Sequence, residues 1–367
     1  MSDKIIYLDN AASSRVYPEV IREMSRVMSQ DYGNPSSLHS MGEKAREEID
    51  NARKVLAKEI NAKPWEIIFT SGGTEAINLA FFGLASGGKK KIIISAIEHP
   101  CTYEICDVLK KKGFKIVEIP VNKAGLLDLA ALEKEIDSST LLVSVIHANN
   151  EIGVVQNLDQ IGYLCGLKKV PLHVDALQSY GKENIDVKKC NISLLSAGAH
   201  KIGGPKGVGF LYVKEGLEIN PMIYGGGQEK GMRGGTENVP GIVGFAKALE
   251  MTKRIDREKI REVRDYFIHQ MEGFGAKING SRKDRSYNNV SASLDMDAES
   301  AVISLSRKGI MCSTGSACES KKQKESKVLK AIGLSSKDIA GTLRFSLDEK
   351  TSKKDVDYVI EQLRKLK

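Results

Sequence analysis

Residues 141–153 read L-L-V-S-V-I-H-A-N-N-E-I-G, a run rich in β-branched side chains that is followed at once by polar residues. Such a run predicts a β-strand at 141–146, with Asn149 and Asn150 just beyond its end. Similar short runs recur along the chain, at 67–70, 92–95, 115–119, 171–175, 192–196 and 208–213. Because helical segments are expected between many of them, the sequence predicts an α/β domain with a largely parallel sheet.

The same patterns predict the helices and the domain division. Apolar residues at helical spacing predict helices at 74–84, 102–112 and 129–136, and two long helices at 37–60 and 239–268. The last hundred residues mix strands, at 290–294 and 342–347, with helices, at 298–307 and 353–366. We therefore expect a large domain of residues 13–256 and a smaller α+β domain formed by residues 1–12 and 257–367, with the opening strand at 5–8 in the smaller one.

The composition is that of an ordinary globular protein. The 367 residues are 41% hydrophobic and 28% charged, with no apolar run long enough to span a bilayer. The N-terminus lacks the apolar core of a signal peptide, which predicts a cytoplasmic protein with no membrane partner. The net charge of +8 lies partly in lysine runs without a nucleic-acid motif, so direct nucleic-acid binding is not expected. None of the six cysteines forms a C-x-x-C pair, and we expect neither a disulfide framework nor a metal site.

Polar residues follow several of the predicted strands, at the edge where open α/β sheets bind ligands. After the strand at 67–70 comes S-G-G-T-E-A, which places Gly73 and Thr74 at the start of a helix. Free backbone N–H groups and the helix dipole suit a phosphate there, although Thr74 as a plain N-cap is the alternative. The spacing is neither that of a P-loop nor that of a dinucleotide fingerprint.

Three further strand ends carry His99, Asp175 and Lys201. An aspartate at the end of a buried strand is costly unless it meets a cation, and a protonated ring nitrogen is one such partner. Lys201 lies in A-H-K-I-G-G-P-K-G-V-G, where glycines let the backbone approach a bulky group closely. Taken singly these are a loop histidine, a turn cap and a surface lysine. Taken together with the phosphate-binding helix start at Gly73 and Thr74, they describe a site for pyridoxal phosphate (PLP), with Lys201 as the Schiff-base lysine.

At this point the sequence resembles the NifS/IscS-type cysteine desulfurases, over nearly its whole length. The resemblance is carried by Y-L-D-N-A-A-S at 7–13, G-N-P-S-S-L-H at 33–39, T-S-G-G-T-E at 70–75, E-H at 98–99, N-N-E-I-G at 149–153, H-V-D-A-L-Q at 173–178, H-K-I-G-G-P-K-G-V-G at 200–209, R-G-G-T-E-N at 233–238, S-T-G-S-A-C at 313–318 and L-R-F-S-L at 343–347. It implies the fold of the fold-type I PLP-dependent transferases, with a mostly parallel seven-stranded sheet in the large domain and a smaller α+β domain.

The resemblance also implies a role for each matching residue. Around the cofactor these are phosphate binding by Gly73, Thr74 and His200, ring stacking and proton transfer by His99, pairing with the ring nitrogen by Asp175, and contact with the 3-oxygen region by Gln178 and Asn150. Thr236 is expected to reach the PLP phosphate of the neighbouring subunit, which implies a homodimer. Arg344 is expected to bind the substrate carboxylate together with Asn150, with a strand-face salt bridge as the alternative.

The implied reaction converts L-cysteine to L-alanine. Lys201 moves a proton from the substrate Cα, and the Cys318 thiolate attacks the substrate sulfur, with His99 as the candidate base for the thiol. Cys318 then holds the sulfur as a persulfide and passes it to an acceptor protein, either an iron–sulfur scaffold or a tRNA-thiolation enzyme. Cys312, on the same stretch, is expected to be a core residue rather than a resolving thiol.

Two features depart from the family pattern. Gly198 stands where the family often has a phosphate-binding serine, so either one phosphate contact is missing or Ser196 or a backbone N–H replaces it. The chain ends at Lys367, soon after its last predicted helix, so docking of a scaffold through a C-terminal tail is not expected. The alternative functions are a selenocysteine lyase or another class V PLP enzyme, and a non-catalytic scaffold with the same fold.

Overall fold

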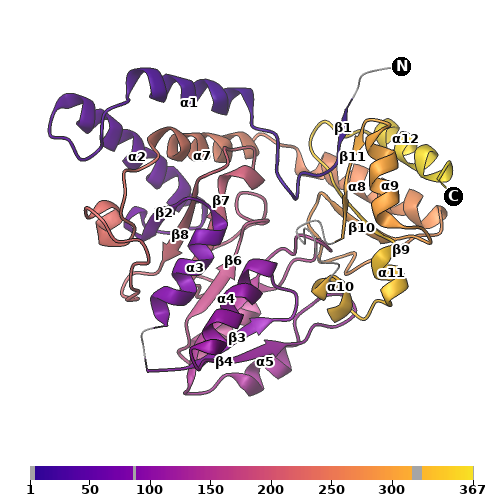
Figure 1. Cartoon of the computed structure of the whole chain (residues 1–367), viewed down its shortest axis with the longest axis horizontal. Helices are drawn as coiled ribbons and strands as arrows, with labels where there is room; N and C mark the ends of the chain where they lie inside the picture. The colour runs from indigo at the N-terminus through magenta and orange to yellow at the C-terminus, as the bar shows by residue number, and fades with distance from the viewer. Residues whose placement is uncertain (1–4, 86–87, 316–324, 367) are drawn as a thin grey trace.

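A computed structural model of the chain describes residues 5–85, 88–315 and 325–366. Figure 1 shows two parts, a larger one built on a twisted sheet and a smaller one that contains both the first strand and the last helix. The chain enters the smaller part, builds the larger one, and returns.

Seven strands form the large sheet, in the order β2-β8-β7-β6-β5-β3-β4. Their bounds are β2 Ile67–Thr70, β3 Lys91–Ser95, β4 Lys115–Ile119, β5 Thr140–Ile146, β6 Leu172–Asp175, β7 Leu194–Gly198 and β8 Gly209–Val213. β8 runs antiparallel to both of its neighbours, and the other pairs are parallel. The mostly parallel seven-stranded sheet is therefore confirmed.

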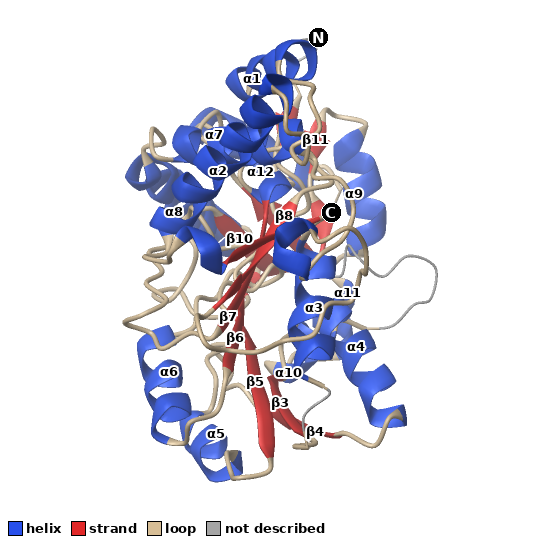
Figure 2. Cartoon of the chain, turned by 90° about the vertical axis from the view of Figure 1, so that its left-hand side faces the viewer, coloured by secondary structure: helices blue, strands red, loops and turns tan. Residues whose placement is uncertain are grey.

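Helices cover both faces of this sheet. They are α1 Pro18–Gln30, α2 Ser40–Glu59, α3 Gly73–Leu84, α4 Pro100–Lys111, α5 Leu129–Glu135, α6 Leu158–Leu167 and α7 Val239–Thr252, with short 3₁₀ turns η1 Pro64–Glu66, η2 Ala199–Lys201 and η3 Gln228–Gly231. In Figure 2, α5 and α6 lie on one side of the sheet and α3 and α4 on the other. The buried side chains follow this division, because α2, α5, α6 and α7 contribute to one hydrophobic cluster and α3 and α4 to another. Burial on both faces is the reason that β3 and β5 are apolar over most of their length.

The smaller part is a four-stranded antiparallel sheet, β12-β13-β10-β9, covered by helices. Its elements are β9 Lys277–Ile278, β10 Asn289–Ser293, β11 Ile310–Met311, β12 Ser313–Thr314, β13 Thr342–Ser346, α8 Arg257–Gly273, α9 Ala298–Ser306, α10 Lys327–Ala331, α11 Ser336–Ala340 and α12 Lys353–Arg364. β1, Ile6–Tyr7, pairs in parallel with β11, so the opening strand does belong to this part. The domain boundaries at residues 12/13 and 256/257 remain our proposal.

Two expectations from the sequence are wrong. The single long helix expected at 239–268 is two helices, because the chain leaves helical geometry after Thr252 and Asp256 begins α8 by accepting a hydrogen bond from the Lys259 backbone N–H. The strand expected at 192–196 begins two residues later, at Leu194, and continues to Gly198. Within the described residues, no helix is long and apolar enough to cross a membrane.

Candidate active site

The polar residues singled out in the sequence follow five strands that end at one edge of the sheet. β5, β6 and β7 are in parallel register there, with Ile146 opposite Asp175 and Asp175 opposite Ser196. The segments after β2, β3, β5, β6 and β7 carry Thr74, His99, Asn150, Gln178 and Lys201, respectively. Parallel pairing is the physical reason that residues up to about 130 positions apart meet at this edge.

Lys201 lies in η2 and points its amine at the N-terminal segment of the chain. Its Nζ donates hydrogen bonds to the backbone oxygens of Ala11, at 2.7 Å, and Ala12, at 2.8 Å. The side-chain Nε2 of Gln178 donates to the same Ala11 oxygen at 2.7 Å. Lys201 and Gln178, from two different strand ends, therefore meet at one carbonyl group.

Asp175 is a buried carboxylate at the end of β6, with 2% of its surface exposed. Burial raises its pKa to about 6, against the opposing effects of the Leu177 backbone N–H and the charge of Lys201. The Leu177 N–H donates to Oδ1 at 2.9 Å. Within the described residues, no cation lies within ion-pair distance of Asp175. A buried carboxyl group without a neighbouring cation suits a ligand that carries its own positive charge.

His99 caps the N-terminus of α4, where its Nδ1 accepts a hydrogen bond from the Cys101 backbone N–H at 3.2 Å. Burial, followed by the positive charge of Lys201, lowers its pKa to about 4, so the imidazole is neutral at neutral pH. Because Nδ1 is the acceptor, the ring proton is on Nε2. In this conformation His99 therefore presents a proton donor rather than a base.

The N-terminus of α3 forms a cup of backbone N–H groups beside η2. A side chain at Gly73 would place its Cβ 2.0 Å from a methyl group of Leu177, so a bare backbone is needed there unless Leu177 moves. The first N–H groups of a helix have no partner within it, which leaves them free for an anion. Burial lowers the pKa of His200 to about 4, and its neutral ring lies 3.4 Å from the Ser13 hydroxyl.

Gly198, the departure from the family pattern, lies next to this cup. A Cβ at this position would be 3.7 Å from the Gly73 backbone nitrogen, with no contact shorter than that. The suggested substitute, Ser196, is wrong, because it is fully buried and its hydroxyl is hydrogen-bonded to Nε2 of His173 at 2.9 Å. There is therefore room at position 198 for a side chain that adds one more hydrogen-bond donor to the N–H groups at the start of α3.

We expect Gly198→Ser to bind PLP about tenfold more tightly, because its hydroxyl would reach a charged phosphate oxygen without a steric cost. The measurement is an equilibrium titration of cofactor-stripped protein with PLP. Gly198→Ala is the matched control, since it adds the Cβ without the hydroxyl. Equal affinities for the serine and alanine variants would contradict the prediction.

Arg344 reaches the same edge from β13 of the smaller sheet. Its Nη1 donates to the Asn150 backbone oxygen at 3.1 Å, and its Nη2 is paired with Oδ1 of Asp9 at 2.8 Å. The guanidinium is 1% exposed, and neither its Nε nor Oδ1 of Asn150 has a partner among the described residues. The salt bridge considered as the alternative therefore exists, with Asp9 as the partner. The hydrogen bond to the Asn150 oxygen places Arg344 beside Asn150, and each of these two residues keeps a buried polar atom without a partner among the described residues.

Thr236 is exposed and lies in the loop before α7 rather than among these residues. Arg233 ties that loop to α3 through Glu75, with Nε 2.9 Å from the carboxylate. Because Glu75 follows Thr74 directly, the loop is anchored next to the N-terminus of α3 while Thr236 itself stays exposed.

Cys318 lies outside the described residues. On one side of it, Ser313 of β12 pairs with Arg344 of β13. On the other side, the Ser326 hydroxyl donates to the Glu151 carboxylate at 2.5 Å. Cys312 belongs to the hydrophobic cluster of the smaller part, and burial raises the pKa of its thiol to about 12, as expected for a core residue.

Sequence reasoning assigned no role to the segment from Ala11 to Ser14, although its first three residues are part of the motif at 7–13. The Ser14 hydroxyl donates to the Lys201 backbone oxygen at 3.0 Å, and the Ser14 N–H donates to the His200 oxygen at 2.9 Å. Asn149, by contrast, is a turn residue, since its Oδ1 accepts from the backbone N–H groups of Glu151 and Ile152.

The arrangement fits PLP. The cofactor needs an amine for a Schiff base, a carboxylate for its ring nitrogen, a flat side chain to stack on, and a cup of N–H groups for its phosphate. These are provided in turn by Lys201, Asp175, His99 and the start of α3. The observation that favours a cationic ring is that the buried Asp175 has no cation within ion-pair distance among the described residues.

Comparisons with known proteins agree with this arrangement. Residues 6–359 match the family of class V aminotransferases. A cysteine desulfurase IscS of Clostridium botulinum is 42% identical over 375 residues, covering 99% of this chain and 94% of that protein. The corresponding protein of Dictyoglomus turgidum is 41% identical, covering 98% and 94%. Among solved structures, a NifS-like protein superposes with a TM-score of 0.93 at 35% identity, covering 99% of each chain. SspA in complex with cysteine superposes with a TM-score of 0.85 at 36% identity, covering 93% and 98%.

Proposed function

This chain belongs to the class V aminotransferase family, and we propose that it is a PLP-dependent cysteine desulfurase that converts L-cysteine to L-alanine and a protein-bound persulfide. The observation that carries the proposal is the meeting of the Lys201 amine, the buried Asp175 carboxyl and the neutral His99 ring at one edge of the sheet. The relatives named cysteine desulfurase at 40–42% identity support the choice of reaction within the family.

PLP, when bound, supplies an electron sink that stabilises negative charge at the substrate Cα. Asp175 holds the ring nitrogen in its protonated form, and the N–H groups at the start of α3, with Thr74 and His200, hold the phosphate. Gln178 and Asn150 would contact the 3-oxygen region. Lys201 would hold the cofactor covalently, and its amine would move the Cα proton of the substrate.

The substrate is bound and cleaved by residues from both parts of the molecule. Asn150 and Arg344 bind the L-cysteine carboxylate, and the buried guanidinium makes this contact strong because water is excluded. The thiolate of Cys318 attacks the substrate sulfur, an S–S bond forms, and the C–S bond breaks with its electron pair left on carbon. His99 donates a proton from Nε2 as that carbon becomes the methyl group of alanine. Cys318 is left as the persulfide.

The partners follow from the same reaction. We propose a homodimer in which the exposed Thr236 reaches the PLP phosphate of the other subunit, and a sulfur acceptor that is an iron–sulfur scaffold or a tRNA-thiolation enzyme. A cytoplasmic location likewise stays a prediction.

The test is the visible absorption spectrum of the purified protein with and without L-cysteine, combined with an assay for alanine and sulfide. We expect a band of covalently bound PLP that shifts when cysteine is added, and equal amounts of alanine and released sulfide under a reducing thiol. A band that does not respond to cysteine would contradict the substrate. No band after incubation with PLP would contradict the whole proposal in favour of a non-catalytic scaffold.

A further inference from the structure

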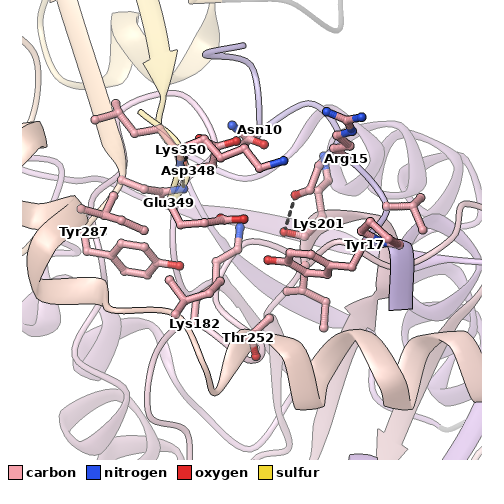
Figure 3. Close-up of a pocket in the computed structure, with 18 residues that line it drawn as sticks. Asn10, Arg15, Tyr17, Lys182, Lys201, Thr252, Tyr287, Asp348, Glu349 and Lys350 are labelled. Carbon is pink, nitrogen blue, oxygen red and sulfur yellow. Dashed lines mark hydrogen bonds between the residues drawn. The ribbon is translucent and has the colours of Figure 1, made fainter. Parts of the chain in front are cut away.

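A second feature lies beside the candidate active site, at the junction of the two parts of the molecule. A cavity of about 120 Å³ lies between the N-terminal segment, η2, the junction of α7 and α8, and the turn between β13 and α12 (Figure 3). Lys201 lines it, whereas Asp175, His99 and Gly73 do not. This volume has room for several water molecules or for a small organic ion.

Lys182 is the central cation of this cavity. It is 7% exposed, and Figure 3 shows its amine directed into the cavity. Over residues 5–85, 88–315 and 325–366, no acceptor lies within hydrogen-bond distance of its Nζ and no carboxylate lies within 4.0 Å of it. A buried ammonium group without a counter-ion is strongly disfavoured. Burial and then the charge of Lys201 accordingly lower the pKa of Lys182 to about 7.

Two tyrosine hydroxyls from different elements face the same space. Tyr17 precedes α1 and Tyr287 precedes β10, and Figure 3 shows both hydroxyls pointing into the cavity. Burial is the main cause that raises both pKa values, that of Tyr287 to about 12, so both groups stay protonated and can donate. Neither hydroxyl has a hydrogen-bond partner among the described residues. The Arg257 guanidinium lies over the Tyr287 ring, 5.9 Å from its centre, and its Nη2 donates to the Gly181 oxygen.

The remaining charges define which anion would suit the cavity. The wall also carries Arg15 and Lys350, together with Asp348 and Glu349, so it has two more cations than anions. The charge of Glu183 raises the pKa of Lys182, and the charge of Arg257 lowers it. Glu349 helps to raise the pKa of both tyrosines, so its carboxylate faces them, but it makes no ion pair with Lys182. The net positive charge of the wall favours an anion, and the grouping of Lys182 with the two tyrosine hydroxyls suits a ligand with one carboxylate group.

We propose that this cavity binds a small carboxylate monoanion of the size of acetate, with Lys182 as its counter-ion and the hydroxyls of Tyr17 and Tyr287 as hydrogen-bond donors. These three groups can donate to both oxygens of one carboxylate, and one of the hydrogen bonds is charge-assisted. The site is separate from the substrate-carboxylate role of Arg344 and does not depend on the proposed reaction. Because Lys201 lines the same cavity, the bound anion would favour positive charge on the Lys201 nitrogen.

The test is isothermal titration of the holoenzyme with sodium acetate, with chloride keeping the ionic strength constant. The wild-type protein should bind acetate about tenfold more tightly at pH 6 than at pH 8. The reason is that the ammonium form of Lys182, whose pKa is about 7, is the binding form. Lys182→Met should weaken binding at pH 6 by at least about tenfold.

Two further variants establish whether acetate binds in this cavity or at another place on the protein. Arg344→Lys should retain the wild-type affinity, because Arg344 does not line the cavity. Glu349→Gln keeps Lys182 and removes a competing negative charge, so it should bind acetate about threefold more tightly. This variant keeps the proposal testable if Lys182→Met does not fold. No acetate binding by the wild type, binding that persists in Lys182→Met, loss of binding in Arg344→Lys, or no gain in Glu349→Gln would each overturn the proposal.

Discussion

Replacing Lys201 with alanine is expected to abolish covalent attachment of PLP and to lower alanine formation by at least about 10³-fold. Lys201 is the only lysine whose amine meets Gln178 at the Ala11 oxygen within the described residues. In the proposed function it supplies both the Schiff base and the proton transfer, and a positioned proton-transfer group alone contributes about 10² to 10⁴ in rate. The measurement is borohydride reduction followed by mass spectrometry, with activity measured in parallel.

A matched control is available on the same loop. Lys206 is exposed five residues further along, so Lys206→Ala should retain the cofactor adduct and the activity. Peptide mapping of the wild-type protein should locate the adduct on Lys201. Lys182 is the rival, because it is buried nearby and its pKa of about 7 makes its amine nucleophilic. An adduct that survives in Lys201→Ala would refute the assignment.

Replacing Cys318 with alanine is expected to separate cofactor chemistry from sulfur transfer. The variant should keep the absorption band of bound PLP and its shift on adding L-cysteine, because Lys201, Asp175 and His99 are unchanged. Alanine formation should fall on the order of 10³-fold or more, since loss of a nucleophile removes the reaction path itself. Mass spectrometry of the wild-type protein after a brief reaction without reductant should show one added sulfur atom on the peptide that contains Cys318.

Cys312→Ala provides the comparison within the same stretch of chain. Cys312 is buried in the hydrophobic cluster of the smaller part. Burial raises the pKa of its thiol to about 12, so the thiol is almost entirely un-ionised at neutral pH. This variant should keep its activity and lose only some stability. Retention of activity in Cys318→Ala together with its loss in Cys312→Ala would reverse the two roles.

Much of the candidate site was accessible from the sequence because its residues lie directly after strands. A short β-branched run predicts a strand with few alternatives, and parallel strands deliver their following residues to one edge. His99, Asp175 and Lys201 were identified in this way, and their motifs pointed to the family. The wrong helix at 239–268 has the opposite cause. Its apolar spacing continues across residues 253–256, while the break depends on a single cap formed by Asp256, a signal too local to outweigh the pattern.

Other features depend on contacts that no local pattern encodes. Arg344 is in a strand of the smaller sheet, yet its guanidinium is held by Asp9 and Asn150, which are 335 and 194 residues away. The orientation of His99, and hence which of its nitrogens carries the proton, depends on one backbone hydrogen bond at the start of α4. The reversed direction of β8 is also a result of the assembled sheet, since an apolar run has the same appearance in either direction.

The sequence by itself determined the type of fold and the cofactor and predicted the residues of the candidate site, because strand periodicity and the order of the strand-end motifs are properties of short segments. Tertiary structure alone decided the surroundings of those residues. The Lys201 amine is held by carbonyl groups 190 and 189 residues away in the chain, and Lys182 faces a cavity built from six separate segments. Burial, charge balance and protonation depend on every group packed around a side chain, so they exist only once distant segments have come together.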